Sequence, residues 1–145
     1  MKALSGYAEW FWLMAKNIKP VENRVWSLSR YFRRAELPVR IYLHASKTPA
    51  PRDDIDVIVS LLTDEEFELF DMVDFDELRG KLIGEVTIVD EVRGDDIGMD
   101  ITRSPWFVGP YGFVVEDGLL YDKPIPCRGQ LGFFNPEVPV ERRAI

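Results

Sequence analysis

The chain has few of the residues on which disulfides and most metal sites depend. Its 145 residues include one cysteine, Cys127, and one histidine, His44. A single cysteine cannot form an internal disulfide, and one cysteine with one histidine supplies no ligand cluster for zinc. The acidic residues lack the spacing of a calcium loop, and no glycine-rich phosphate loop is present. The sequence therefore predicts neither a metal ion nor a cofactor.

Long hydrophobic runs are also missing. The apolar stretch from Tyr7 to Met14 is interrupted by Glu9 and closed by Lys16, whereas a membrane span needs roughly 20 apolar residues. Nothing at the N-terminus combines a basic start with an apolar run and a small-residue cleavage site. We therefore expect a cytoplasmic protein that makes no contact with a membrane.

Basic residues are outnumbered overall and unevenly distributed. The net charge is −7, from 18 Lys and Arg against 25 Asp and Glu. Residues 1–52 carry ten basic and three acidic groups, so residues 53–145 carry eight basic and 22 acidic ones. A basic surface can attract phosphate on an acidic protein when the opposing charge lies beyond a Debye length. The uneven charge therefore allows a nucleic-acid partner, and a solvated acidic helical region is the alternative interpretation.

The chain does contain enough apolar material for one core. Apolar residues make up 46% and aromatic residues 12% of the sequence, and 145 residues is a common size for one domain. We expect a single domain over residues 1–145.

The pattern of the apolar residues predicts a mixed fold. Strands are expected at residues 2–5, from Glu22 onward, at 39–46, 82–89, 113–121 around a turn at Asp117 and Gly118, and 130–134. Helices are expected at 7–17, from Asp53 or Asp54 to about Leu62, and after a capping box formed by Thr63 and Glu66. Strands and helices do not alternate regularly, so we expect an α+β fold, a small mixed β-barrel with short flanking helices.

Charged groups that can carry chemistry concentrate at residues 19–24. Pro20 disfavours helical geometry at Lys19, which places Lys19 between a helix and a strand. Alternation along that strand places Glu22 and Arg24 on one face. Burial beside Arg24 would favour a neutral Lys19, whereas a neighbouring Glu22 stabilises the charged ammonium. Two chemical roles follow from this. In one, a protonated Lys19 contacts a phosphate or an oxyanion, and in the other, Glu22 acts as the base that activates water. An ion-pair network that only stabilises the junction is the alternative.

Lys19, Glu22 and Arg24 resemble the signature of the ASCH family, G-x-K-x-x-E-x-R, with Asn17 at the position of the glycine. Asparagine adopts the left-handed conformation at a helix end more readily than most residues. The resemblance also covers residues 3–5, Trp10, Trp26, and residues 44–47, 83–86, 104–107, 109–113 and 124–129.

The resemblance implies a PUA-like barrel with a cleft where the three charged residues meet RNA or a modified base. Some ASCH-like proteins hydrolyse an acyl group from a modified cytidine, and others are reported to cut single-stranded RNA. The acylcytidine hydrolases commonly carry threonine where this chain has Glu22. The resemblance therefore indicates the site more specifically than the reaction.

Further residues are candidates for contact with nucleic acid. His44 and Ser46 share a strand face, with Lys47 adjacent, and Trp106 and Tyr111 offer flat rings on which a base can stack, with Phe113 expected in the core. A Ser–His–acid hydrolase has no support, because no strand-turn-helix elbow with a glycine-flanked serine is present. The predicted catalytic residues are Lys19, Glu22 and Arg24, and the predicted nucleic-acid-binding residues are Ser5, Trp10, Arg30, Arg33, Arg34, His44, Ser46, Lys47, Trp106 and Tyr111.

Three functions remain open at this point. The first is an RNA-binding protein that holds single-stranded RNA or a modified nucleobase in the cleft. The second is a hydrolase, either a ribonuclease or a modified-nucleoside amidohydrolase, that uses Lys19, Glu22 and Arg24. The third is a protein-interaction domain that binds its partner through the acidic region 53–76, with the three charged residues in a structural role.

Overall fold

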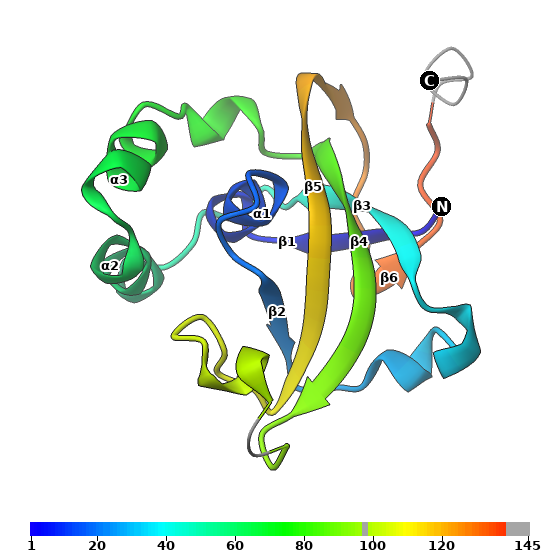
Figure 1. Cartoon of the computed structure of the whole chain (residues 1–145). Helices are drawn as coiled ribbons and strands as arrows, with labels where there is room; N and C mark the ends of the chain where they lie inside the picture. Colours follow the sequence, from blue (N-terminus) through cyan, green and yellow to red (C-terminus); the bar gives the residue numbers. More distant parts are fainter. Residues whose placement is uncertain (97–98, 139–145) are drawn as a thin grey trace.

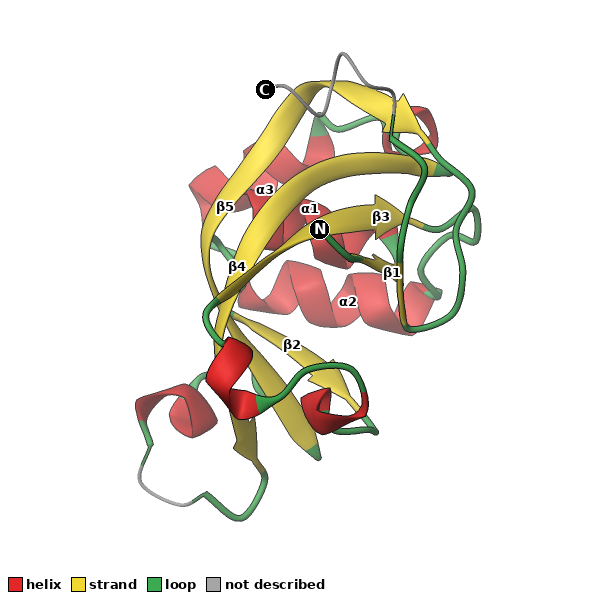
Figure 2. Ribbon diagram, turned by 90° about the vertical axis from the view of Figure 1, so that its right-hand side faces the viewer, coloured by secondary structure: helices red, strands yellow, loops and turns green. Residues whose placement is uncertain are grey.

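A computed structural model describes residues 1–96 and 99–138, and its centre is a strongly curved sheet. Figures 1 and 2 show this sheet curling around helix α1 (Ala8–Ala15) as a half-barrel. The six strands of the described residues lie in the order β2–β5–β4–β3–β1–β6. Their bounds are Ala3–Gly6 (β1), Val21–Arg24 (β2), Val39–Ala45 (β3), Lys81–Arg93 (β4), Tyr111–Pro126 (β5) and Phe133–Phe134 (β6). The predicted α+β class is confirmed.

Long, bent strands give the sheet its curvature. β1 pairs with β3 in parallel, and all other pairs are antiparallel. The pairing of β4 with β5 shifts register at three places, and such irregularities bend a strand and increase its twist. β4 and β5 are therefore curved enough to follow the outside of α1, which packs against both of them and against β3.

The predicted turn at Asp117 and Gly118 is wrong, because β5 runs through both residues. Thr87 pairs with Glu116 and Glu85 with Leu119, so β5 contains one residue more than β4 at this point. Asp117 has φ 54°, a left-handed value that asparagine and aspartate tolerate better than most residues. The Asp-Gly pair therefore forms a bulge in one long strand, where the sequence pattern indicated a turn.

The end of α1 agrees with the expectation for Asn17. Asn17 has φ 60°, and its side chain both donates to Gly118 O (3.1 Å) and accepts from Gly118 N (2.7 Å). The helix ends at Ala15, two residues before the predicted limit, because the left-handed residue stops the helical path. The connection 16–20 then leads into β2 and carries Lys19 between helix and strand, as predicted.

The acidic region forms two helices outside α1, α2 (Arg52–Leu61) and α3 (Asp64–Asp71). The predicted capping box is present: Thr63 Oγ1 accepts from Glu66 N at 3.2 Å, and Glu66 accepts from Thr63 N at 2.9 Å. Ile58 is fully buried and anchors α2 to an apolar cluster with Trp12 and Leu13. No helix in the described part of the chain is both long and apolar enough to cross a bilayer.

Short 3-10 turns connect the remaining segments: η1 (Leu28–Arg30), η2 (Arg34–Glu36), η3 (Phe75–Glu77) and η4 (Asp100–Arg103). The last strand is shorter than predicted, since β6 begins at Phe133 and residues 127–132 form a loop. Gly132 has φ 66°, which is incompatible with strand geometry just before β6. Phe133 packs in the main core with Phe113, which is fully buried as expected.

Candidate functional site

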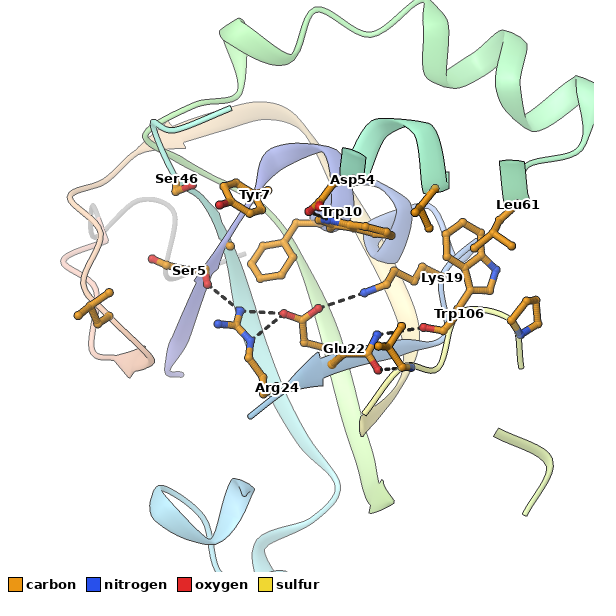
Figure 3. A pocket seen from close by; sticks show the side chains of 17 residues that line it. Ser5, Tyr7, Trp10, Lys19, Glu22, Arg24, Ser46, Asp54, Leu61 and Trp106 are labelled. Carbon is orange, nitrogen blue, oxygen red and sulfur yellow. Dashed lines mark hydrogen bonds and ion pairs between the residues drawn. The ribbon is translucent and has the colours of Figure 1, made fainter. Parts of the chain in front are cut away.

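A cleft of about 660 Å³ lies between β1, β2, α2 and the segment 105–108. Figure 3 shows Ser5 and Ser46 near one end of this first cleft and Trp106 and Leu61 near the other, with the three charged residues between them. The residues that line it are Ser5, Gly6, Tyr7, Trp10, Phe11, Lys19, Glu22, Asn23, Arg24, Ser46, Asp54, Val57, Leu61, Pro105, Trp106, Val108 and Leu131.

The structure brings Lys19, Glu22 and Arg24 together around the carboxylate of Glu22. Oε1 accepts from Lys19 Nζ at 3.2 Å, and Oε2 accepts from Arg24 Nε at 2.9 Å and lies 2.7 Å from Nη2. Arg24 Nη2 also donates to the carbonyl of Ser5 on β1 at 2.8 Å. The charged trio, as we call these three residues, therefore joins the α1–β2 connection to both β2 and β1.

Burial shifts the proton equilibria of the trio. Lys19 is 4% and Glu22 6% exposed. Burial lowers the pKa of Lys19 below its ordinary value, and the attraction of Glu22 offsets this only in part. For Glu22, burial acts to raise the pKa, but Lys19 and Arg24 outweigh it, so the pKa is lowered. Glu22 is thus a weak base held in its ionised form, whereas Lys19 releases its proton more readily than an exposed lysine.

The floor of the cleft offers hydrogen-bond donors to a ligand. Arg24 Nη1 has no hydrogen-bond partner among the described residues, and the Arg24 side chain is 21% exposed. Lys19 Nζ makes one hydrogen bond, to Glu22, and lies 4.9 Å from the centre of the Trp10 ring. Because Glu22 already accepts on both oxygens, a ligand meets unused N–H groups here more readily than a free carboxylate.

Two tryptophans form an aromatic wall whose geometry is fixed by polar neighbours. The rings of Trp10 and Trp106 lie 6.3 Å apart at 86°, and Trp10 Nε1 donates to Asp54 Oδ2 on α2 at 2.9 Å. Asn23 donates to Trp106 O (3.0 Å) and accepts from the N–H groups of Val108 (2.9 Å) and Gly109 (3.0 Å). Asn23 thereby attaches the segment 106–109 to β2.

Asn23 and Asp54 were not among the predicted site residues. Strand alternation predicts Asn23 on the face opposite Glu22. The sequence predicts Asp53 or Asp54 only as a helix cap, which is wrong, because α2 begins at Arg52 with Pro51 at its N-cap. The sequence held a partial signal for Asn23, which lies inside the charged motif. Asp54 has none, because its contact with Trp10 joins residues 44 positions apart.

A second cleft, of about 820 Å³, adjoins the first and is lined by Ser5, His44, Ser46, Lys47, Gly80 and residues 127–131. The buried His44 connects its two sides. His44 Nε2 lies 2.7 Å from the carbonyl of Cys127, which can only accept, so Nε2 carries the proton. Burial lowers the pKa of His44, with the Cys127 carbonyl opposing, which favours the neutral ring. Nδ1 then accepts from Ser5 Oγ at 3.0 Å.

Four predicted contact residues lie outside both clefts. Two of them lie in the segment 27–38, outside the lining of either cleft. Arg33 forms an ion pair with Glu36 at 3.2 Å, and Arg34 forms one with Asp90 at 3.1 Å. The guanidinium of Arg30 lies 5.8 Å from the centre of the Trp26 ring, and the ring of Tyr111 lies 5.5 Å from the guanidinium of Arg93. Contact between nucleic acid and these four residues, Arg30, Arg33, Arg34 and Tyr111, stays a prediction.

Comparison with known proteins gives no relative: no family model and no curated protein matches the chain. Among residues 1–96 and 99–138, no group of three or more His, Cys, Asp or Glu side chains is placed to hold a metal ion. The first cleft therefore has to be interpreted from its own groups. These are an aromatic wall, an apolar lining from α2, and a largely buried charged trio with unused N–H donors.

Proposed function

We propose that the chain binds RNA or a modified nucleoside by taking one nucleobase into the first cleft. The observation that carries this proposal is the cleft of about 660 Å³ that combines the aromatic wall of Trp10 and Trp106 with the charged trio on its floor. Small-molecule sites are mostly apolar with a few convergent polar groups, and nucleobases combine flat faces with an edge of ring nitrogens and carbonyls. The N–H groups of Lys19 and Arg24 match the acceptors of such an edge.

We further propose that the chain is an ASCH-type protein with a PUA-like barrel. The resemblance of its Lys-x-x-Glu-x-Arg motif to the ASCH signature is supported by three findings. Asn17 has the left-handed conformation, at φ 60°, that the glycine of the signature would supply. The three charged side chains meet in one cleft. The sheet is a half-barrel around one helix.

Binding is favoured over catalysis by Glu22 because of the environment of its carboxylate. Both oxygens already accept hydrogen bonds from cations, and the same cations lower the pKa of Glu22. A general base works best when its pKa lies near the operating pH. Glu22 is therefore better suited to hold Lys19 and Arg24 in place than to activate water.

The test is a calorimetric titration with the four common nucleosides and short single-stranded RNAs at low salt. Val57 lines the first cleft and is 48% exposed, so Val57→Trp adds a large ring to the wall of the cleft and changes no residue of the charged trio. Val59 lies on the same helix, is 41% exposed and lines neither cleft, so Val59→Trp is the matched control. We expect binding to be lost in Val57→Trp and kept in Val59→Trp. Absence of binding to every nucleoside and RNA would refute the proposal.

A hydrolase that removes an acyl group from a modified nucleobase is the second candidate. The lowered pKa of Lys19 favours it, since a buried amine that loses its proton more readily can act as a base. Arg24 Nη1 is then placed to stabilise developing negative charge. The assay is release of the acyl group from N-acylated nucleosides, and turnover should disappear in Lys19→Met. Unchanged turnover in that variant would remove Lys19 from the mechanism.

A further inference from the structure

The second cleft has the charge of a site for an anion. Its lining contains two charged side chains, Lys47 and Arg128, and no carboxylate, although the chain as a whole has a net charge of −7. Both residues are exposed, and neither side chain makes a hydrogen bond or an ion pair within the described residues. By contrast, Arg40 and Arg79 are paired with Glu85 and Glu9. Two unpaired cations thus face one cleft.

The two clefts are direct neighbours. Ser5, Ser46 and Leu131 line both of them, and Figure 3 shows Ser5 and Ser46 near one end of the first cleft. A ligand whose base lies beside Trp10 can therefore extend past Ser5 toward Lys47 and Arg128. In a nucleotide, the sugar and its phosphate are attached to the base, so they are the groups that would extend toward the second cleft.

The loop that carries Arg128 is held in place by His44. The ring donates to the Cys127 carbonyl at 2.7 Å, and Gly129 packs against the ring so closely that a Cβ there would lie 2.4 Å from His44 Cε1. A neutral His44 contributes no charge of its own, but it fixes the backbone on both sides of Arg128. A backbone that is already fixed loses less entropy when its side chain binds an anion than a freely moving loop would.

We infer that the second cleft binds the phosphate of a nucleotide whose base occupies the first cleft, an inference that rests on the function proposed above. The ligand class is then a nucleoside phosphate, either a free mononucleotide or a residue within an RNA strand. Arg128 supplies a planar pair of donors suited to phosphate oxygens, and Lys47 supplies a compact charge. Because both cations are exposed, we expect the phosphate to strengthen binding by about tenfold at low salt.

The experiment compares nucleosides with their 5′- and 3′-monophosphates and with a short RNA, by calorimetric titration at low and high salt. We expect a monophosphate or the RNA to bind about tenfold tighter than the nucleoside, with an advantage that shrinks as salt rises. The double variant Lys47→Gln/Arg128→Gln should abolish this advantage and leave nucleoside affinity unchanged. Lys16→Gln/Lys123→Gln removes the same charge from exposed residues outside both clefts and should behave as wild type.

The outcomes separate this inference from the proposed function. If nucleosides bind but neither the monophosphates nor the RNA binds tighter, the second cleft is not a phosphate site and the base cleft stands. A phosphate advantage that survives in the Lys47/Arg128 variant also overturns the inference. An advantage seen with RNA alone supports it and identifies the strand as the source of the phosphate. If no nucleoside, nucleotide or RNA binds, both the inference and the proposed function fail.

Discussion

Replacing Glu22 by glutamine removes one charge and nearly preserves the shape of the side chain, so it isolates what the carboxylate does for the trio. In the native chain Glu22 accepts from Lys19 and from Arg24, and both Lys19 and Glu22 are buried. Glutamine would present an amide N–H₂ group to one of the two cations. The substitution therefore leaves a buried ammonium without its counter-ion.

The size of the effect follows from burial. Removing one partner of a buried ion pair costs about 3–5 kcal/mol. We expect the lower end, about 3 kcal/mol, since the Arg24 side chain is 21% exposed and water can solvate it in part. For a chain of 145 residues this corresponds to a fall in Tm of roughly 10 °C.

The loss of stability should depend on pH in a defined direction. Without Glu22, the pKa of Lys19 falls further below its ordinary value, because burial is no longer opposed. Between that lowered pKa and the unfolded value of 10.5, the unfolded chain binds more protons than the folded one, so the free energy of unfolding of the variant rises with pH. The difference between wild type and Glu22→Gln should therefore shrink as the solution is made alkaline.

The assay is chemical denaturation of both proteins at several pH values, with Glu68→Gln as control. Glu68 is an exposed glutamate of α3 without a partner among the described residues, so this variant should match wild type. A Glu22→Gln protein as stable as wild type would refute the argument that the carboxylate stabilises the buried Lys19 and the partly buried Arg24. A loss of stability that does not change with pH would refute the role assigned to Lys19.

Three further predictions concern other contacts. Asn23→Ala removes the hydrogen bonds that hold residues 106–109, so it should lower the free energy of unfolding by about 1–2 kcal/mol and weaken ligand binding. Denaturation and titration curves that match those of the wild type would contradict this prediction. Gly84→Ala places a Cβ 2.1 Å from the backbone oxygen of Leu119, so it should lower the free energy of unfolding by about 3 kcal/mol. In the control Gly94→Ala the nearest atom to the new Cβ is 4.0 Å away, so chemical denaturation should give nearly the wild-type stability. Burial lowers the pKa of His44 from 6.5, so the unfolded chain takes up the extra proton first and the free energy of unfolding should fall as pH drops below that value. Denaturation curves of His44→Gln should show a smaller fall, and an unchanged pH dependence would contradict the assignment of His44 as a buried neutral ring.

Local sequence signals predicted the parts of the fold that depend on neighbouring residues. Pro20 and Asn17 predicted the end of α1 to within two residues, and Thr63 with Glu66 predicted the start of α3, because capping and left-handed residues act within one turn. Alternation likewise placed Glu22 and Arg24 on a common face. Glu22 and Arg24 also lie close to Lys19, because all three belong to the same short segment of chain.

The rest depends on contacts between distant residues. The Asp-Gly pair at 117–118 resembles a turn locally, but pairing with β4 and the close approach of Gly118 to the carbonyl of Met14 keep it inside one strand. Similarly, two basic residues of the first part of the chain pair with acidic residues of the second part, Arg34 with Asp90 and Arg40 with Glu85. Neither arrangement has a signal in local sequence, because each is decided by packing across the sheet.

The most direct test of the central claim is to follow the indole N–H signals of Trp10 and Trp106 by NMR during titration with nucleosides and short RNA. If a nucleobase occupies the first cleft, both signals should shift and saturate together, and neither should shift in Val57→Trp. If neither signal shifts in the wild type at any ligand concentration, or if the shifts persist in Val57→Trp, the first cleft is not a nucleobase site.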